Sequence, residues 1–257
     1  METPVIQRYY KQKLLVFITV WMIGATLFTV FMTEAVAKDR MANGHKKTLV
    51  FDPGHGGYET GVKGPSGTYE KDITLAFVRM LADRLEEKYR VHLTRTDDYY
   101  VDLYGRTAVT NHLKADLFIS IHTGGSTIHT LNGVSVFYFG GISETAMMLE
   151  AGSLKSPEGG DARVVWDHLQ DKHKRSSSNL AERIGHHLAD PLGLTKIKIQ
   201  KAPLKVLEGA DMPAVLIEIG YLTHPAGEKK LKDNSVLSDF ANAVANGIDD
   251  YFKKYPS

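Results

Sequence analysis

Val215-Leu216-Ile217-Glu218-Ile219-Gly220 is the stretch that decides the fold, because it sets one carboxylate inside an apolar run that reads as a buried strand. An ionised carboxylate without a partner is costly in such surroundings, so a nearby group must hold Glu218. Two other apolar runs, residues 49–51 and 117–121, lead into His55 and His122. In an open α/β sheet, chemistry gathers at the carboxyl ends of the strands. We therefore predict that these three side chains converge, and that they converge on a metal ion.

Strand and helix patterns alternate along the chain. Strand patterns cover residues 47–52, 90–94, 116–121, 133–139, 204–207 and 214–219. Helix patterns cover residues 70–87, 102–113, 143–149, 163–170, 178–190 and 237–252. This alternation predicts an α/β fold, a single domain with a mixed, mostly parallel twisted sheet that helices flank on both faces.

The amino-terminal segment differs from the rest of the chain. Basic residues precede an uncharged apolar stretch at residues 14–33, and Ala35-Val36-Ala37 follows it. This pattern is typical of an export signal cleaved after Ala37, although the stretch is also long enough to cross a bilayer as an uncleaved anchor. We predict a signal peptide or membrane anchor at residues 1–37, a linker at 38–46 and a folded domain at 47–257. The domain would lie outside the cytoplasm, in the periplasm or cell envelope, held to the inner membrane by residues 14–33 if these are retained.

Composition excludes several classes of function. Without residues 1–37 the chain carries no formal net charge, so it lacks the basic excess that nucleic acid binding requires. The chain has no cysteine, which excludes thiolate metal sites and cysteine nucleophiles. Any metal ion must therefore be held by histidine, aspartate or glutamate.

The candidate ligands are His55, Glu70 and His122. His55 ends a glycine-rich turn and Glu70 opens a helix, so each also has an ordinary reading, as a surface histidine and as a carboxylate that complements the helix dipole. Catalytic zinc takes three protein ligands and leaves a fourth position for an activated water. Glu218 would then act as general base toward the water and as acid toward the leaving amine. A buried ion pair with a lysine or arginine is the alternative for Glu218.

These residues also belong to several ordered motifs that span most of residues 47–252. On them the chain resembles the zinc-dependent N-acetylmuramoyl-L-alanine amidases of the bacterial cell wall. The resemblance implies one zinc ion per chain, bound by His55, Glu70 and His122, and a catalytic Glu218. It implies that the substrate is peptidoglycan, cut between the lactyl group of N-acetylmuramic acid and L-alanine. The motifs are Phe51-Asp52-Pro53-Gly54-His55-Gly56-Gly57, Glu70-Lys71-Asp72, Thr94-Arg95, residues 115–122 and residues 212–222.

Two positions depart from the family pattern. Thr123-Gly124-Gly125 follows His122 where the family has a small residue and then asparagine, and His224 stands where asparagine is usual. Substrate contacts are expected from Thr123 and His224, from His129 in a loop, and from Arg95. The alternative for Arg95 is an ion pair with a carboxylate such as Asp97.

Two other functions remain open, a related zinc carboxypeptidase acting on stem peptides and an inactive module that only binds the cell wall. Control is also open, because residues 140–177 form a long insertion of the kind that makes lids. In that reading Glu150 occupies the open zinc position until an activator protein displaces the segment. In the other reading the insertion is a solvated helix-loop-helix without influence on the site.

Overall fold

The computed structural model describes residue 21 and residues 46–125, 133–140, 160–189 and 197–256, with the backbone alone at 160–172. The chain divides into two compact units, residues 1–46 and 47–257. The predicted export segment, most of the linker, His129 and the segment 141–159 with Glu150 lie outside the described residues. Among the helices that are described, none combines the length and apolar character needed to cross a bilayer.

Six strands form one sheet in the order β2-β1-β3-β6-β4-β5. Neighbouring strands run parallel except β4 and β6, which pair antiparallel. The predicted mixed, mostly parallel sheet is confirmed. The strands are β1 (Thr48–Pro53), β2 (Arg90–Leu93), β3 (Leu117–Gly124), β4 (Ser135–Phe139), β5 (Lys198–Ala202) and β6 (Ala214–Tyr221).

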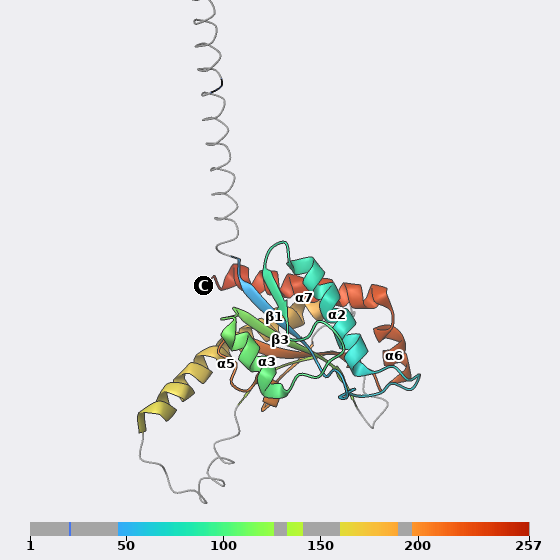
Figure 1. Ribbon diagram of the computed structural model, residues 1–257, viewed down its shortest axis with the longest axis horizontal. Coiled ribbons are helices and arrows are strands. Elements are labelled where there is room, and N and C mark those ends of the chain that lie inside the picture. Colours follow the sequence, from blue (N-terminus) through green and yellow to red (C-terminus); the bar gives the residue numbers. More distant parts are fainter. Residues whose placement is uncertain (1–20, 22–45, 126–132, 141–159, 190–196, 257) are drawn as a thin grey trace, which may run out of the picture. The chain divides into compact units, whose positions relative to one another are not determined.

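Helices cover both faces of this sheet. Figure 1 shows α2 and α7 on one side of the strands and α3 on the other. A large core joins the sheet to α2, α5 and α7, whereas a smaller core lies toward α3 and the 3-10 helix η2. The helices are α2 (Glu70–Leu85), α3 (Leu103–His112), α5 (Gly160–Ala189), η2 (Lys205–Leu207), α6 (Pro225–Leu231) and α7 (Asn234–Lys254).

Alternate residues of the central strands enter different cores. Ile119 and Ile121 of β3 pack in the large core, whereas Phe118 of the same strand packs in the smaller core. Since side chains alternate along a strand, His122 lies on the face of Phe118. Glu218 of β6 pairs in register with His122 and lies on that face as well. The hydrophobic pattern therefore carries both polar groups to one face of the sheet, near its carboxyl edge.

Three predicted elements differ from the structure, and one strand was missed. Residues 204–207 are not a strand, because Val206 and Leu207 bury their side chains in the smaller core from a 3-10 turn. The edge strand lies earlier, at Lys198–Ala202, where Lys198, Gln200 and Lys201 leave too few apolar residues for a strand signal. The helices predicted at 163–170 and 178–190 are one helix, α5, since the polar residues between them include no glycine or proline to stop it.

Candidate metal centre and catalytic carboxylate

Three side chains from separate parts of the chain meet at the carboxyl edge of the sheet. His55 follows β1, Glu70 opens α2 and His122 lies in β3. The Glu70 carboxylate oxygens lie 3.2 Å from His55 Nε2 and 3.0 Å from His122 Nδ1. One donor atom from each of the three residues lies within 4.8 Å of the others. The structure thus brings together the three residues that the sequence nominated as metal ligands.

His55 is fixed by an unusual backbone conformation. Its φ angle is 60°, in the left-handed region that few residues other than glycine adopt. Arg106 donates from Nη2 to the His55 carbonyl oxygen at 3.0 Å, which holds the turn against α3. Strain of this kind persists only where the surroundings impose it, and it is common at functional sites.

Two glycines leave room for the three side chains. A Cβ atom on Gly54 would lie 2.4 Å from the His122 ring, and one on Gly61 would lie 2.5 Å from the nearer Glu70 carboxylate oxygen. Gly61 also has a φ of +68°, which disfavours any other residue. The glycines at these positions are therefore required by the close approach of the cluster.

The Glu70 carboxylate accepts hydrogen bonds on both oxygens. The backbone N–H groups of Val62 and Thr123 donate to it at 3.0 and 2.9 Å. Burial opposes ionisation, but the hydrogen bonds from His122 and His55 outweigh it and hold the pKa of Glu70 well below its ordinary value. Glu70 is therefore a preformed anion, which is the state a metal ligand needs.

A buried ion pair braces the strand end below the cluster. Arg106 donates from Nη1 to an Asp52 carboxylate oxygen at 2.6 Å, and both side chains are nearly inaccessible. The hydroxyl groups of Thr94 and Ser120 also donate to Asp52. The Asp52 carboxylate thus has donors on both oxygens.

Glu218 lies beside the cluster on the neighbouring strand. Burial raises its pKa, with a further contribution from the negative charge of Glu70, although His122 and Lys198 act in the opposite direction. Within the part of the chain that the structure describes, no lysine or arginine forms an ion pair with Glu218. The alternative of a buried ion pair is therefore not supported.

A bulge follows Glu218 in β6. Between His122 and Gly124 of β3 there is one residue, whereas the matching stretch of β6 from Glu218 to Tyr221 contains two. The extra residue brings Tyr221 onto the face of Glu218, and the negative charge of Glu218 adds to burial in raising the pKa of Tyr221. Tyr221 was not among the predicted site residues; strict alternation along the strand would put it on the other face, so the sequence alone gives no signal for its place beside Glu218.

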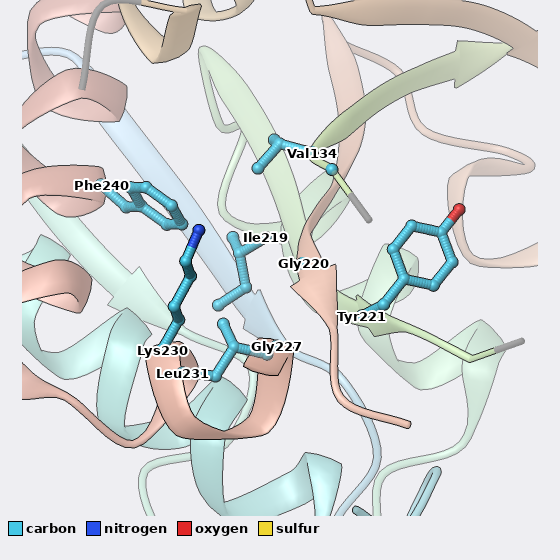
Figure 2. Close-up of a pocket in the computed structure, with 9 residues that line it drawn as sticks. Val134, Ile219, Gly220, Tyr221, Gly227, Lys230, Leu231 and Phe240 are labelled. Atoms are coloured by element: carbon cyan, nitrogen blue, oxygen red, sulfur yellow. The ribbon is translucent and has the colours of Figure 1, made fainter. Parts of the chain in front are cut away.

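A small apolar pocket lies on the opposite side of the bulge, with about 30 Å³ of room for water-sized groups. Figure 2 shows Ile219, Leu231 and Phe240 around this pocket, while Tyr221 points away across β6. A volume of this size holds about one water molecule, so the pocket is too small for a substrate.

The residues predicted to contact substrate have different places. Arg95 is fully buried and donates to the carbonyl groups of Pro53 and Gly54, so it supports the His55 turn. Its contact with Asp97 is to the carbonyl oxygen rather than to the carboxylate. His224 caps α6, where Nδ1 accepts from Ala226 and Gly227 as an asparagine would. Thr123 orients Glu70 through its N–H, and its hydroxyl is buried without a partner among the described residues.

Two imidazoles and one carboxylate are a donor set typical of catalytic zinc. A tetrahedral zinc ion with bonds of about 2.0–2.2 Å separates neighbouring ligand atoms by roughly 3.3–3.6 Å. The distances from His122 Nδ1 to Glu70 Oε1, 3.0 Å, and from His55 Nε2 to Glu70 Oε2, 3.2 Å, are close to this spacing. The residues present therefore fit a zinc ion.

Comparison with known proteins gives a consistent result. A family model for N-acetylmuramoyl-L-alanine amidase matches residues 49–250. The amidase AmiC of Neisseria meningitidis is 31% identical over 225 residues, which cover 82% of this chain and 54% of that protein. AmiA of Salmonella typhimurium is 31% identical over 248 residues, 86% of each chain. The chain thus spans about half the length of the first relative and most of the second.

Solved structures show the same architecture. The catalytic domain of CwlV, an N-acetylmuramoyl-L-alanine amidase from Bacillus (Paenibacillus) polymyxa var. colistinus, is 29% identical. It has a TM-score of 0.63, with 80% of this chain and 98% of that chain covered. AmiC2 of Nostoc punctiforme is 28% identical with a TM-score of 0.64, covering 81% of this chain and 98% of its own.

Proposed function

The chain belongs to the N-acetylmuramoyl-L-alanine amidase family, and from this premise we propose that it hydrolyses the amide between the lactyl group of N-acetylmuramic acid and L-alanine in peptidoglycan. The observation that carries the proposal is the convergence of His55, Glu70 and His122 beside Glu218, which lies on the adjacent strand and has no ion-pair partner among the described residues. A metal site alone would account for binding of an ion but not for proton transfer. A half-buried carboxylate alone would only destabilise the fold. Together they are the parts that amide hydrolysis needs.

We propose that the three ligands hold one zinc ion. Zinc bound there would polarise the amide carbonyl and lower the pKa of water. The chain itself contributes the ionised Glu70 and a His55 turn braced by Arg95 and Arg106. These contacts orient the donor atoms, since hydrogen bonds behind the ligands fix their direction.

Glu218 supplies the acid and base chemistry in this proposal. As a carboxylate it accepts a proton from the attacking water, and as a carboxylic acid it returns the proton to the leaving amine of L-alanine. Burial raises its pKa toward the working range, which makes the second step easier than for an exposed glutamate.

We also propose that the protein acts outside the cytoplasm, where peptidoglycan lies. The export pattern of residues 1–37 supports this location, and retention of residues 14–33 would add a membrane contact. A lid formed by residues 140–177, and an activator that displaces it, remain proposals. Changing Glu150 to alanine should raise basal hydrolysis if the segment covers the metal, and unchanged hydrolysis would reject the lid.

Mass spectrometry of the muropeptides released from purified peptidoglycan tests the proposed reaction. The expected products are free stem peptides with an L-alanine amino terminus and glycan strands without peptides. Release of terminal amino acids from otherwise intact stems would instead identify a carboxypeptidase. No product at all from folded, zinc-loaded protein would favour an inactive wall-binding module.

Chelation provides the test of the metal. We expect activity to vanish on removal of metal and to return when zinc is added back, with one zinc ion per chain. His55→Ala should lose the metal while the fold remains, which circular dichroism checks. Full activity in a metal-free preparation would contradict the assignment.

A further inference from the structure

The exposed aromatic residues of the catalytic unit gather in one place. Among the described residues of 47–257, the large hydrophobic side chains with high exposure are Tyr58, Tyr99, Tyr100, Leu103, Tyr104 and Val109. Tyr58 is 76% exposed, and its ring lies 4.5 Å from that of Tyr100 in a tilted stack. Exposed apolar groups scattered singly are ordinary, whereas a cluster marks a surface that binds something.

This cluster is attached to the metal centre. Tyr58 comes three residues after the ligand His55, so the two Cα atoms are at most about 11 Å apart. The Gly57 N–H donates to Asp98 at 2.8 Å, and Lys71 joins the Gly57 carbonyl oxygen to the same carboxylate. The loop that carries Tyr99 and Tyr100 is therefore fixed to the turn that carries His55. The stacked rings form a rigid extension of the site.

We propose that the stacked pair Tyr58 and Tyr100 is a binding platform for the sugar part of the substrate. This rests on the proposed function, because the amide that is cut joins an N-acetylated sugar to a peptide. The sugar must then lie to one side of the metal and the peptide to the other. Flat aromatic faces bury the apolar C–H faces of a pyranose ring, and phenol groups can bond its hydroxyls.

Charge supports the sugar over other occupants. Exposed carboxylates stand close to the platform residues in sequence, at Glu59, Asp97, Asp98 and Asp102, and Asp98 also bonds the Gly57 N–H. Carboxylates accept hydrogen bonds from sugar hydroxyls, but they repel the terminal carboxylate of a peptide and an anionic lipid surface. A neutral N-acetylhexosamine chain is thus the partner that matches both the rings and their surroundings.

The test uses the metal-loaded full chain and a β-1,4-linked tetramer of N-acetylglucosamine, with binding measured by NMR titration. The tetramer contains no amide to a peptide, so its binding does not depend on catalysis, and Glu218→Gln should bind it as the parent does. We expect the double variant Tyr58→Ala, Tyr100→Ala to weaken binding at least about tenfold, since stacking at each ring contributes severalfold. Changing both to phenylalanine should restore most of the affinity.

Tyr255→Ala is the matched control. Tyr255 also contacts another ring, that of Tyr251, but it follows α7 near Phe252, which lies against Lys47 at the amino end of β1. It should leave tetramer binding unchanged. On polymeric peptidoglycan the double alanine variant should raise KM with little change in kcat, because the platform binds the sugar equally in the ground state and in the transition state.

Equal binding of the tetramer by parent and double variant, or none by the parent, would overturn the inference. The inference would also fail if the parent bound anionic phosphatidylglycerol vesicles but not the tetramer, and if the double variant lost the vesicle binding. That result would assign the platform to a membrane surface. If the tetramer binds at the platform but the muropeptide assay shows no amide cleavage, the proposed reaction is rejected. The assignment of the platform as a sugar-binding site is then retained.

Discussion

The carboxylates on the two sides of the candidate site differ in their hydrogen-bond partners and in the direction of their pKa shifts. On the β1 and β3 side, Asp52 and Glu70 are each surrounded by donors, and the pKa of Glu70 is driven down. On the β6 side, Glu218 is half-buried and forms no ion pair with the described residues, and desolvation raises its pKa. We call the first the matched side, because its carboxylates have hydrogen-bond donors and hold the site in place. We call the second the unmatched side, because Glu218 is available there to accept and return a proton. The cost of leaving Glu218 unpaired makes sense only if its reactivity is used.

Removal of the Glu218 charge is expected to have the largest effect on activity. Glu218→Gln should lower turnover roughly 10²–10⁴-fold, the usual range for losing a general acid and base. Because no partner is left unpaired, zinc content and thermal stability should stay close to those of the parent. Muropeptide release, metal analysis and calorimetry on the same sample measure all three. Near-parental turnover would show that the unmatched carboxylate is not the base.

Substitutions on the matched side should instead lower the free energy of unfolding. Arg106→Leu leaves Asp52 buried with an uncompensated charge, and we expect a loss of about 3–5 kcal/mol in the free energy of unfolding. Lys88→Ala is the control, since Lys88 and Asp249 form an ion pair at the surface. That change should cost at most about 1 kcal/mol. Urea titrations measure the free energy of unfolding of both variants. Similar losses in the two would show that the buried ion pair contributes no more to stability than the surface pair.

A smaller effect is expected at Glu228, a matched carboxylate outside the cluster. It is buried in α6 and accepts from the N–H groups of Ser66 at 2.7 Å and Thr68 at 3.2 Å, which clamps the loop before Glu70. Burial opposes this, but the hydrogen bonds from Thr68 and Ser66 lower the pKa of Glu228 from 4.5 to about 2. Glu228→Gln should cost about 1–2 kcal/mol at neutral pH.

The pH dependence of this variant gives the sharper result. A depressed pKa in the folded state stabilises the fold above pH 4.5, and that contribution disappears as the pH falls toward 2. The stability difference between parent and Glu228→Gln should therefore shrink over that interval. A constant difference across it would mean that the clamp does not depend on the charge.

The sequence predicted the parts of this site that depend on strand ends. His55, His122 and Glu218 each follow or interrupt an apolar run, so the topology of parallel strands was enough to bring them together. Glu70 needed the family motif, because a glutamate at a helix start has an ordinary explanation. Arg95 was read as a candidate substrate contact, and its complete burial could not be seen from its charge. The edge strand β5 was missed because its charged residues hide the alternation.

The bulge in β6 also has a genetic consequence. Gly220, with φ +145°, lies in the stretch where β6 carries one residue more than β3. An in-frame deletion of that single codon would keep Glu218, Tyr221 and every metal ligand in the coding sequence. It would remove the bulge, because Tyr221 would then stand two positions after Glu218 and share its face by regular alternation. A missense change at the same codon would instead keep the extra residue but place a side chain where the backbone φ favours glycine, so two kinds of mutation in one codon would disturb the strand in different ways.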